Sequence, residues 1–157
     1  NLKNINDIND VNFSTCYSTA KSVNGKKPYV EYVLKDTVVF YYISILNGDF
    51  SNETNYYNNG RIKKIKIEYE VNEWETGKSV IKDTILVLKD RKYELINKDN
   101  LAHFVDLIEL ESFVAYGFVK RIKLIFMDNY PGKKNDNICI SEFFINGILW
   151  SEEKSEE

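Results

Sequence analysis

The chain has 157 residues, of which 43% are hydrophobic and 14% aromatic, so it can bury one sizeable core and we expect a single domain. Its formal net charge is -3, without the surplus of Lys and Arg that binding to polyanions requires, so we expect no nucleic acid partner. No apolar run approaches the roughly 20 residues that span a bilayer, and no signal-peptide pattern opens the chain. These properties predict a soluble chain that is not membrane-spanning. A monomer is a separate expectation.

The two ends of the sequence differ from its middle. Residues 1–12 are polar and rich in Asn, which predicts a poorly ordered start or an edge strand. The acidic tail 151–157 has no apolar residue and is expected to be disordered, because it cannot offset its ordering entropy. Residues 13–150 contain no Gly/Ser linker and are expected to form one domain. Since the chain begins with Asn1 rather than Met, loss of a secretory or lipoprotein leader, or of further domains, is a hypothesis.

The middle of the chain has the side-chain rhythm of β-strands. Within residues 61–72, apolar and polar side chains alternate with a period of two from Ile65 to Asn72, as in a strand with one solvated face. Val38–Leu46 is β-branched and aromatic almost throughout, and the turn dipeptide Asn47-Gly48 ends it. Further strands are expected at 83–90, 117–128 and 137–145. Residues 101–108 fit a helix or a covered strand, and we favour the strand.

Many short strands, turns of Gly, Asn and Asp, and the lack of a long helical pattern predict an all-β fold. Two antiparallel sheets packed face to face, a β-sandwich, bury such strands most simply.

The residues do not predict an enzyme. The chain holds one histidine, His103, in an apolar run where a packed imidazole is expected. Ser141 and Cys139 lie in an alternating strand, without the sharp turn that presents a nucleophile. Nearby carboxylates such as Glu109 and Glu111 have the spacing of any solvated edge. We therefore expect no catalytic residues.

The two cysteines, Cys16 and Cys139, leave two alternatives open. A disulfide between them would close a long loop, worth roughly 4 to 5 kcal/mol in the chain-entropy model. Two buried thiols are the other alternative. Neither cysteine has a CxxC or His partner at ligand spacing, which argues against a metal site. No cofactor is expected, although Asp128, Asp136 and Glu142 are candidate oxygen ligands for Ca²⁺.

The segment Asn47–Arg61 is the strongest candidate for ligand binding. Carbohydrate sites combine aromatic faces, which stack on sugar rings, with fixed amide, guanidinium or carboxylate groups that bind the hydroxyls. This segment supplies both and joins two predicted strands, which places it at an end of the sandwich. For each residue the competing interpretation is structural: a Tyr that covers the core, and asparagines that serve turns. The candidates are Asn47, Tyr56, Tyr57, Asn59 and Arg61, with Trp74 as a second aromatic platform.

Three stretches together resemble one family. They are ISILNGDFSNETNYYNNGRIKKIKIEY, LVLKD and NYPGKKNDNICISEFF, and the resemblance covers roughly Thr37 to Gly147. The three stretches resemble the discoidin-like domain known as the NAD glycohydrolase translocation domain. The resemblance implies a galactose-binding-like jelly-roll β-sandwich, an extracytoplasmic bacterial setting often reached through a lipoprotein leader, and non-catalytic binding of glycans or other cell-surface ligands. It does not imply NAD cleavage.

The resemblance also implies site residues. The first motif covers Asn47, Gly48, Tyr57, Asn59, Arg61 and Lys63, and the second covers Tyr130, Gly132, Lys133, Asp136, Ser141 and Glu142. Lys133 and Asp136 thereby join the candidate ligand-binding residues. A buried or half-buried pair of Arg61 with Glu142 is also expected.

Two functions follow as expectations. The first is a non-catalytic carbohydrate-binding (glycan-binding) module of an exported bacterial protein, secreted or held as a surface lipoprotein. The alternative is a protein-interaction or adhesion module on the cell surface, which needs a contiguous apolar patch.

Overall fold

The computed structural model describes residues 12, 15–22, 24–73, 76–97, 99–109 and 117–149. The predicted acidic tail and nearly all of the N-terminal segment 1–12 lie outside these residues, as does Trp74.

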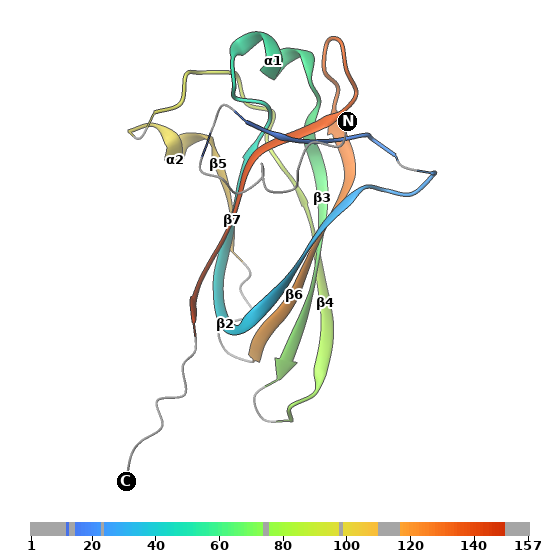
Figure 1. The fold of residues 1–157 in the computed structure, drawn as a ribbon, viewed down its shortest axis with the longest axis vertical. Coiled ribbons are helices and arrows are strands. Elements are labelled where there is room, and N and C mark those ends of the chain that lie inside the picture. The colour runs from blue at the N-terminus through green and yellow to red at the C-terminus, as the bar shows by residue number, and fades with distance from the viewer. Residues whose placement is uncertain are drawn as a thin grey trace.

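Seven strands and two short helices follow one another along the described chain (Figure 1). They are β1 (Tyr17–Thr19), β2 (Tyr29–Asn47), α1 (Glu53–Asn58), β3 (Arg61–Glu73), β4 (Ser79–Val87), α2 (Leu101–Phe104), β5 (Val105–Glu109), β6 (Gly117–Tyr130) and β7 (Ile138–Leu149). Neither helix has the length or the apolar character that crossing a membrane requires.

The strands form two antiparallel sheets that share β2. The first half of β2 pairs with β6, β6 pairs with β3, and β3 pairs with β4. The second half of β2 lies between β7 and β5, and β1 pairs with the other edge of β7. β2 passes from one sheet to the other near Val38, which pairs with both Val119 and Leu149. We call β2–β6–β3–β4 the first sheet and β1–β7–β2–β5 the second sheet. This arrangement confirms the predicted jelly-roll β-sandwich.

The main core fills the space between the two sheets. Ile65, Ile67 and Tyr69 of β3 face inward at every second position, as the predicted alternation requires. Ile43 and Ile45 of β2 belong to the same buried cluster and enter it from the second sheet. The period-two pattern therefore marks the buried face correctly.

The outward face of the first sheet carries interleaved opposite charges. Arg121 of β6 lies between Glu31 and Glu70, with N–O distances of 2.7 and 3.1 Å. Lys66 Nζ lies 2.9 Å from an oxygen of Asp83 on β4. Exposed pairs of this kind add little stability singly, so this face is best described as a solvated surface.

Some predicted elements are wrong in part. Residues 101–108 were predicted as a strand, but α2 occupies Leu101–Phe104 before β5 begins. Within α2, Phe104 takes the buried side, so His103 is exposed rather than packed. β4 begins at Ser79 and ends at Val87, earlier than predicted, because the chain leaves the sheet there to reach the end that carries α1.

Candidate functional site

α1 and the turn between β6 and β7 lie at the same end of the sandwich (Figure 1). α1 begins after Asn52, whose side-chain oxygen accepts a hydrogen bond of 2.8 Å from the backbone N–H of Asn55. The turn docks on the last residues of this helix: Lys133 N donates to Tyr57 O at 2.8 Å, and Asn135 N donates to Asn58 O at 2.9 Å. The two segments singled out in the sequence are therefore neighbours.

Gly132 permits this close docking. A Cβ atom at this position would collide with the carbonyl oxygen of Asn58 and would lie 2.6 Å from the carbonyl carbon of Asn59. Backbone atoms cannot move aside as the end of a flexible side chain can. Glycine at position 132 is thus a requirement of the architecture.

Tyr56 is a core residue. It packs with Leu46, Phe50 and Phe104 in a small second hydrophobic cluster, which we call the end cluster, and its side chain is 1% exposed. Its ring centroid lies 4.8 Å from that of Phe50, and its hydroxyl donates a hydrogen bond of 2.8 Å to the carbonyl of Arg91. Burial raises the pKa of Tyr56 to about 12. The ring cannot stack on a ligand, so the structural interpretation holds.

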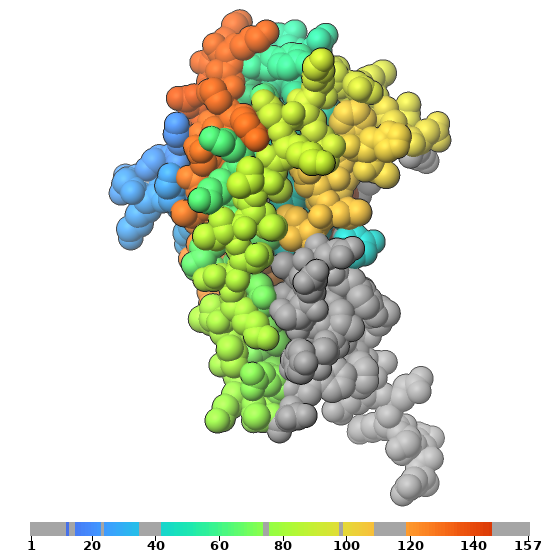
Figure 2. Space-filling model, turned by 180° about the vertical axis from the view of Figure 1, so that it is seen from behind, coloured from blue at the N-terminus to red at the C-terminus, as the bar shows by residue number. Residues whose placement is uncertain are grey.

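The segment after β4 completes this end. Figure 2 shows residues 88–97, in yellow-green, reaching the end that also carries the β6–β7 turn, in orange. Tyr93 packs against the end cluster, and its backbone N–H donates a hydrogen bond of 3.2 Å to the hydroxyl of Tyr57. The end cluster is therefore enclosed by chain from three separate parts of the sequence.

Arg61 contacts Tyr56 of the same end cluster. Its side chain is buried, with Nε 2.8 Å from Asp90 Oδ1 and Nη1 donating to the carbonyl of Tyr56 at 3.0 Å. The guanidinium carbon also lies 4.7 Å from the centroid of the Tyr56 ring. The expected pair with Glu142 is wrong, because Asp90 takes that role while Glu142 is buried within β7.

Asn47 is also structural. Its side-chain oxygen accepts from the backbone N–H of Ile62 and its amide nitrogen donates to the carbonyl of Ile62, both at 2.7 Å. The amide thereby joins the end of β2 to the start of β3. Gly48 follows at φ +132°, and a Cβ there would lie 2.6 Å from the Tyr56 ring.

The other predicted residues that the structure describes, Tyr57, Asn59, Lys133 and Asp136, lie at the surface. Together with Asn135 we call them the loop rim. Tyr57 is half-buried, and the Lys133 ammonium lies 5.1 Å from its ring centroid. Asn59 accepts a hydrogen bond of 3.1 Å from the side-chain amide of Asn135. Asp136 is exposed in the same turn. The loop rim thus gathers polar groups around one aromatic side chain.

The candidate Ca²⁺ ligands lie apart. Asp128 forms a 3.1 Å ion pair with Lys63, and this hydrogen bond lowers the pKa of the Asp128 carboxyl. Asp136 is exposed, whereas Glu142 is fully buried. Among the described residues, potential metal ligands converge at a different place.

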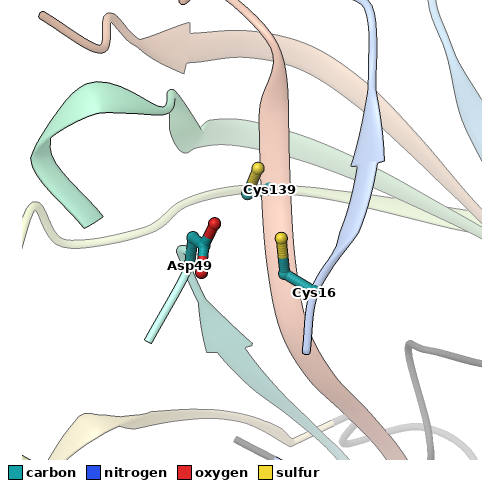
Figure 3. A group of neighbouring side chains, drawn as sticks. All are labelled: Cys16, Asp49 and Cys139. Atoms are coloured by element: carbon teal, nitrogen blue, oxygen red, sulfur yellow. The ribbon is translucent and has the colours of Figure 1, made fainter. Parts of the chain in front are cut away.

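That place holds Cys16, Asp49 and Cys139 (Figure 3). All three are buried, and one ligand atom from each lies within 4.8 Å of the others. Both cysteines are buried thiols in this structure. Of the two alternatives left open by the sequence, a disulfide and two buried thiols, the structure has the second. Asp49 was not a predicted ligand.

A separate open hollow of about 330 Å³ lies on the outer face of the second sheet, beside α2. Its lining is mainly apolar, and Tyr42 and Leu107 remain exposed around it. The other lining residues are Ser44, Leu101, Ala102, Val105 and Phe144. This hollow was not expected from the sequence, because Tyr42 lies within the largely apolar run Val38–Leu46, which does not distinguish one face of the strand from the other.

The model of the NAD glycohydrolase translocation F5/8 type C domain family matches residues 1–146. The chain belongs to this family. No curated protein sequence matches it.

Solved structures agree with this membership at the level of the fold. An F5/8 type C domain from Bacteroides fragilis is 13% identical, with 89% of this chain and 78% of that chain covered and a TM-score of 0.55. The NMR structure of the Streptococcus pyogenes NAD+-glycohydrolase translocation domain is 22% identical, with 82% and 95% covered and a TM-score of 0.51. A putative chitobiase fragment from Bacteroides thetaiotaomicron is 13% identical, with 94% and 77% covered and a TM-score of 0.59.

In this F5/8 type C domain, Ser141 has a structural role. Its hydroxyl donates a hydrogen bond of 2.9 Å to the carbonyl of Gly48 and accepts one of 3.1 Å from the backbone N–H of Phe50. Ser141 thereby holds the turn after β2 against β7, and its oxygen is buried in that role rather than presented to a substrate.

Proposed function

We propose that this domain is a non-catalytic carbohydrate-binding module that holds a glycan at the loop rim. The observation that carries the proposal is the convergence of Tyr57 and Asn59 with Lys133 and Asn135, which come from two segments far apart in the sequence. Of the seven sequence candidates that lie within the described residues, Tyr57, Asn59, Lys133 and Asp136 remain at the surface and are the proposed ligand contacts.

The chemistry of the loop rim suits a polyhydroxylated ligand. The Lys133 ammonium donates to sugar oxygens, the Asp136 carboxylate accepts from hydroxyls, and the amides of Asn59 and Asn135 do both. The Lys133 stack on Tyr57 contributes only about 0.5 to 1 kcal/mol at an exposed site, so a sugar ring can displace the ammonium from the aromatic face. Recognition then combines one stacking surface with several hydrogen bonds.

The fold and family support an extracytoplasmic, bacterial setting for this activity. The similar Streptococcus pyogenes domain is a translocation domain of an NAD+-glycohydrolase, and the similar Bacteroides thetaiotaomicron fragment comes from a putative chitobiase. We propose that the present domain likewise acts outside the cytoplasm, in a secreted protein or a surface lipoprotein, as a monomer that presents or delivers another activity by holding a surface glycan.

The alternative function, binding of a protein partner, requires a contiguous apolar surface. Phe50 and Tyr56 of the loop do not contribute to such a surface, because both are buried in the end cluster. The hollow beside α2 has the apolar character needed. The two functions therefore correspond to two separate surfaces.

A glycan array followed by calorimetric titration of the best sugar tests the proposal. Lys133→Ala is expected to weaken sugar binding severalfold, since it removes an exposed donor without touching the core. Lys123→Ala is the matched control, because Lys123 makes a similar stack on Tyr29, at 4.1 Å from the ring centroid, on the outer face of the first sheet. Its sugar affinity should equal that of the wild type.

Two outcomes would contradict the proposal. Absence of binding to every sugar of a broad array would remove the function itself. Binding that is lost in Tyr42→Ala but unchanged in Lys133→Ala would place the sugar in the hollow beside α2 instead of at the loop rim.

A further inference from the structure

Three buried side chains with metal-ligating atoms converge beside strand β7 of the second sheet (Figure 3). They come from segments far apart in the sequence. Cys16 immediately precedes β1, Asp49 follows β2, and Cys139 lies in β7. Their side chains are 1%, 4% and 1% exposed, respectively. Two sulfurs and a carboxylate oxygen within 4.8 Å of one another, shielded from solvent, form a compact donor set.

Regular backbone pairing positions the two cysteines. In the ladder of β1 and β7, Ser18 is opposite Cys139 and Tyr17 is opposite Ile140. The backbone N–H of Cys139 donates a hydrogen bond of 2.9 Å to the carbonyl of Gly60, which ties this point of β7 to the start of β3. Cys139 is therefore held within a strand, and Cys16 is the residue immediately before one.

Asp49 is held at both its side chain and its backbone. One carboxylate oxygen accepts from the N–H and the hydroxyl of Ser51, at 3.2 and 2.5 Å. The other accepts from the amide of Asn59 at 2.9 Å. Ser141 bonds the residues on either side of Asp49, Gly48 and Phe50. Hydrogen bonds of this kind orient ligating carboxylates in metal sites.

The charge of this group favours a cation. The hydrogen-bond partners of Asp49 are neutral, and in the part of the chain that the structure describes Asp49 makes no ion pair. A buried carboxylate beside two thiols has a high electrostatic cost when they ionise, which a divalent cation offsets. Metal binding converts both thiols to thiolates and releases their protons.

The donor types select the class of metal. Thiolate sulfur is a soft ligand that favours Zn²⁺ over Ca²⁺ and Mg²⁺, which prefer oxygen. Zinc–sulfur bonds of about 2.3 Å and zinc–oxygen bonds of about 2.1 Å place tetrahedral ligand atoms roughly 3.5 to 4 Å apart. The observed separations, all within 4.8 Å, exceed those distances by about 1 Å at most.

We propose that Cys16, Asp49 and Cys139 form a structural site for a thiophilic divalent cation of the Zn²⁺ type. The ion joins β1, β7 and the turn after β2 at a single point, and a water molecule completes its tetrahedral coordination. This site is separate from the loop rim, except that Asn59 orients Asp49 through its amide nitrogen.

Metal titration of the reduced, metal-free wild-type domain tests the site. Zn²⁺ competed against a chromogenic chelator is expected to bind with a stoichiometry of one ion per chain and to raise the thermal midpoint. Co²⁺ used as a probe is expected to give the intense near-ultraviolet absorption of thiolate-to-metal charge transfer. Both measurements use the wild-type protein, so they do not depend on whether a variant folds.

Variants then assign the ligands. Cys139→Ser should at least halve the charge-transfer band, because it removes one of the two thiolates. Asp49→Asn should weaken Zn²⁺ binding at least tenfold while circular dichroism confirms the fold. Asp136→Asn is the matched control, because Asp136 is exposed in the β6–β7 turn, and it should bind as the wild type does.

Three results would overturn the site. They are Zn²⁺ bound below one ion per chain, a Co²⁺ complex without thiolate absorption, and protein isolated without reductant whose mass is lower by two hydrogens. The last result means that the sulfurs are joined as a disulfide and cannot act as ligands.

Discussion

The segments Asn47–Arg61 and Pro131–Asn137 are built from similar polar residues, but the structure uses them in opposite ways. In the first, the residues chosen as ligand contacts are mostly interior: Asn47, Tyr56 and Arg61 are buried and hydrogen-bonded to the chain. The second remains mainly on the surface, docked by backbone hydrogen bonds to α1. Residue type alone therefore did not distinguish structure from recognition.

The difference follows from apolar content. The first segment contains Phe50 and two tyrosines, and together with Leu46 and Phe104 they cover an end of the sandwich that would otherwise expose its core. The second contains no large apolar side chain after Pro131, so it has little to bury. Its position depends on Gly132 and on the carbonyl groups of Tyr57 and Asn58.

Of the changes that test this comparison, removing an aromatic ring from the end cluster should lower the stability of the domain most. Phe50→Ala is expected to lower the free energy of unfolding by about 3 to 5 kcal/mol, because it leaves a cavity among Tyr56, Tyr93 and Phe104. Urea denaturation measures this loss. Leu95→Ala is the control: its side chain is 76% exposed, so its effect should stay within about 0.5 kcal/mol.

The next largest effect is expected for Arg61→Ala. The change removes the ion pair with Asp90 and leaves the Tyr56 carbonyl without its charged donor, so stability should fall by about 2 to 4 kcal/mol. Arg121→Ala removes two ion pairs from the exposed face of the first sheet and should cost much less. Equal losses for the two variants would show that Arg61 is not a structural residue.

Tyr56→Phe should give a smaller, pH-dependent effect. At neutral pH it removes the hydrogen bond to Arg91, worth about 1 kcal/mol. Because the pKa of Tyr56 is raised from 10.0 to about 12 in the folded state, its neutral form stabilises the fold fully below pH 10, and this contribution is lost as the pH rises through 12. Denaturation series at pH 8 to 12 should show a shallower alkaline decline for the variant than for the wild type. Parallel declines would contradict this assignment.

Lys133→Ala should have the smallest effect on stability, within about 0.5 kcal/mol, because Lys133 is exposed and its docking hydrogen bond uses the backbone. The same variant is the one expected to lose sugar affinity. A large loss of stability in urea denaturation would show that the Lys133 side chain stabilises the fold, as the buried residues of the first segment do.

More of the fold than of the candidate site could be predicted from the sequence. The alternation in β3 marks the buried face because side chains on a strand alternate with every residue, whatever the rest of the chain does. By contrast, the burial of Tyr56 depends on Phe104 and Tyr93, which lie far along the chain and meet it only after folding. Ligand spacing along the sequence does not indicate the metal site, because Asp49 comes beside Cys16 and Cys139 only after folding.

The passage of β2 through both sheets has a mechanical consequence. A single strand of 19 residues supplies hydrogen bonds to β6 in one layer and to β7 and β5 in the other. Pulling on either layer loads the same backbone, so we expect the two layers to separate together. We expect the domain to resist extension up to one threshold and then to lose all of its tertiary structure in a single step.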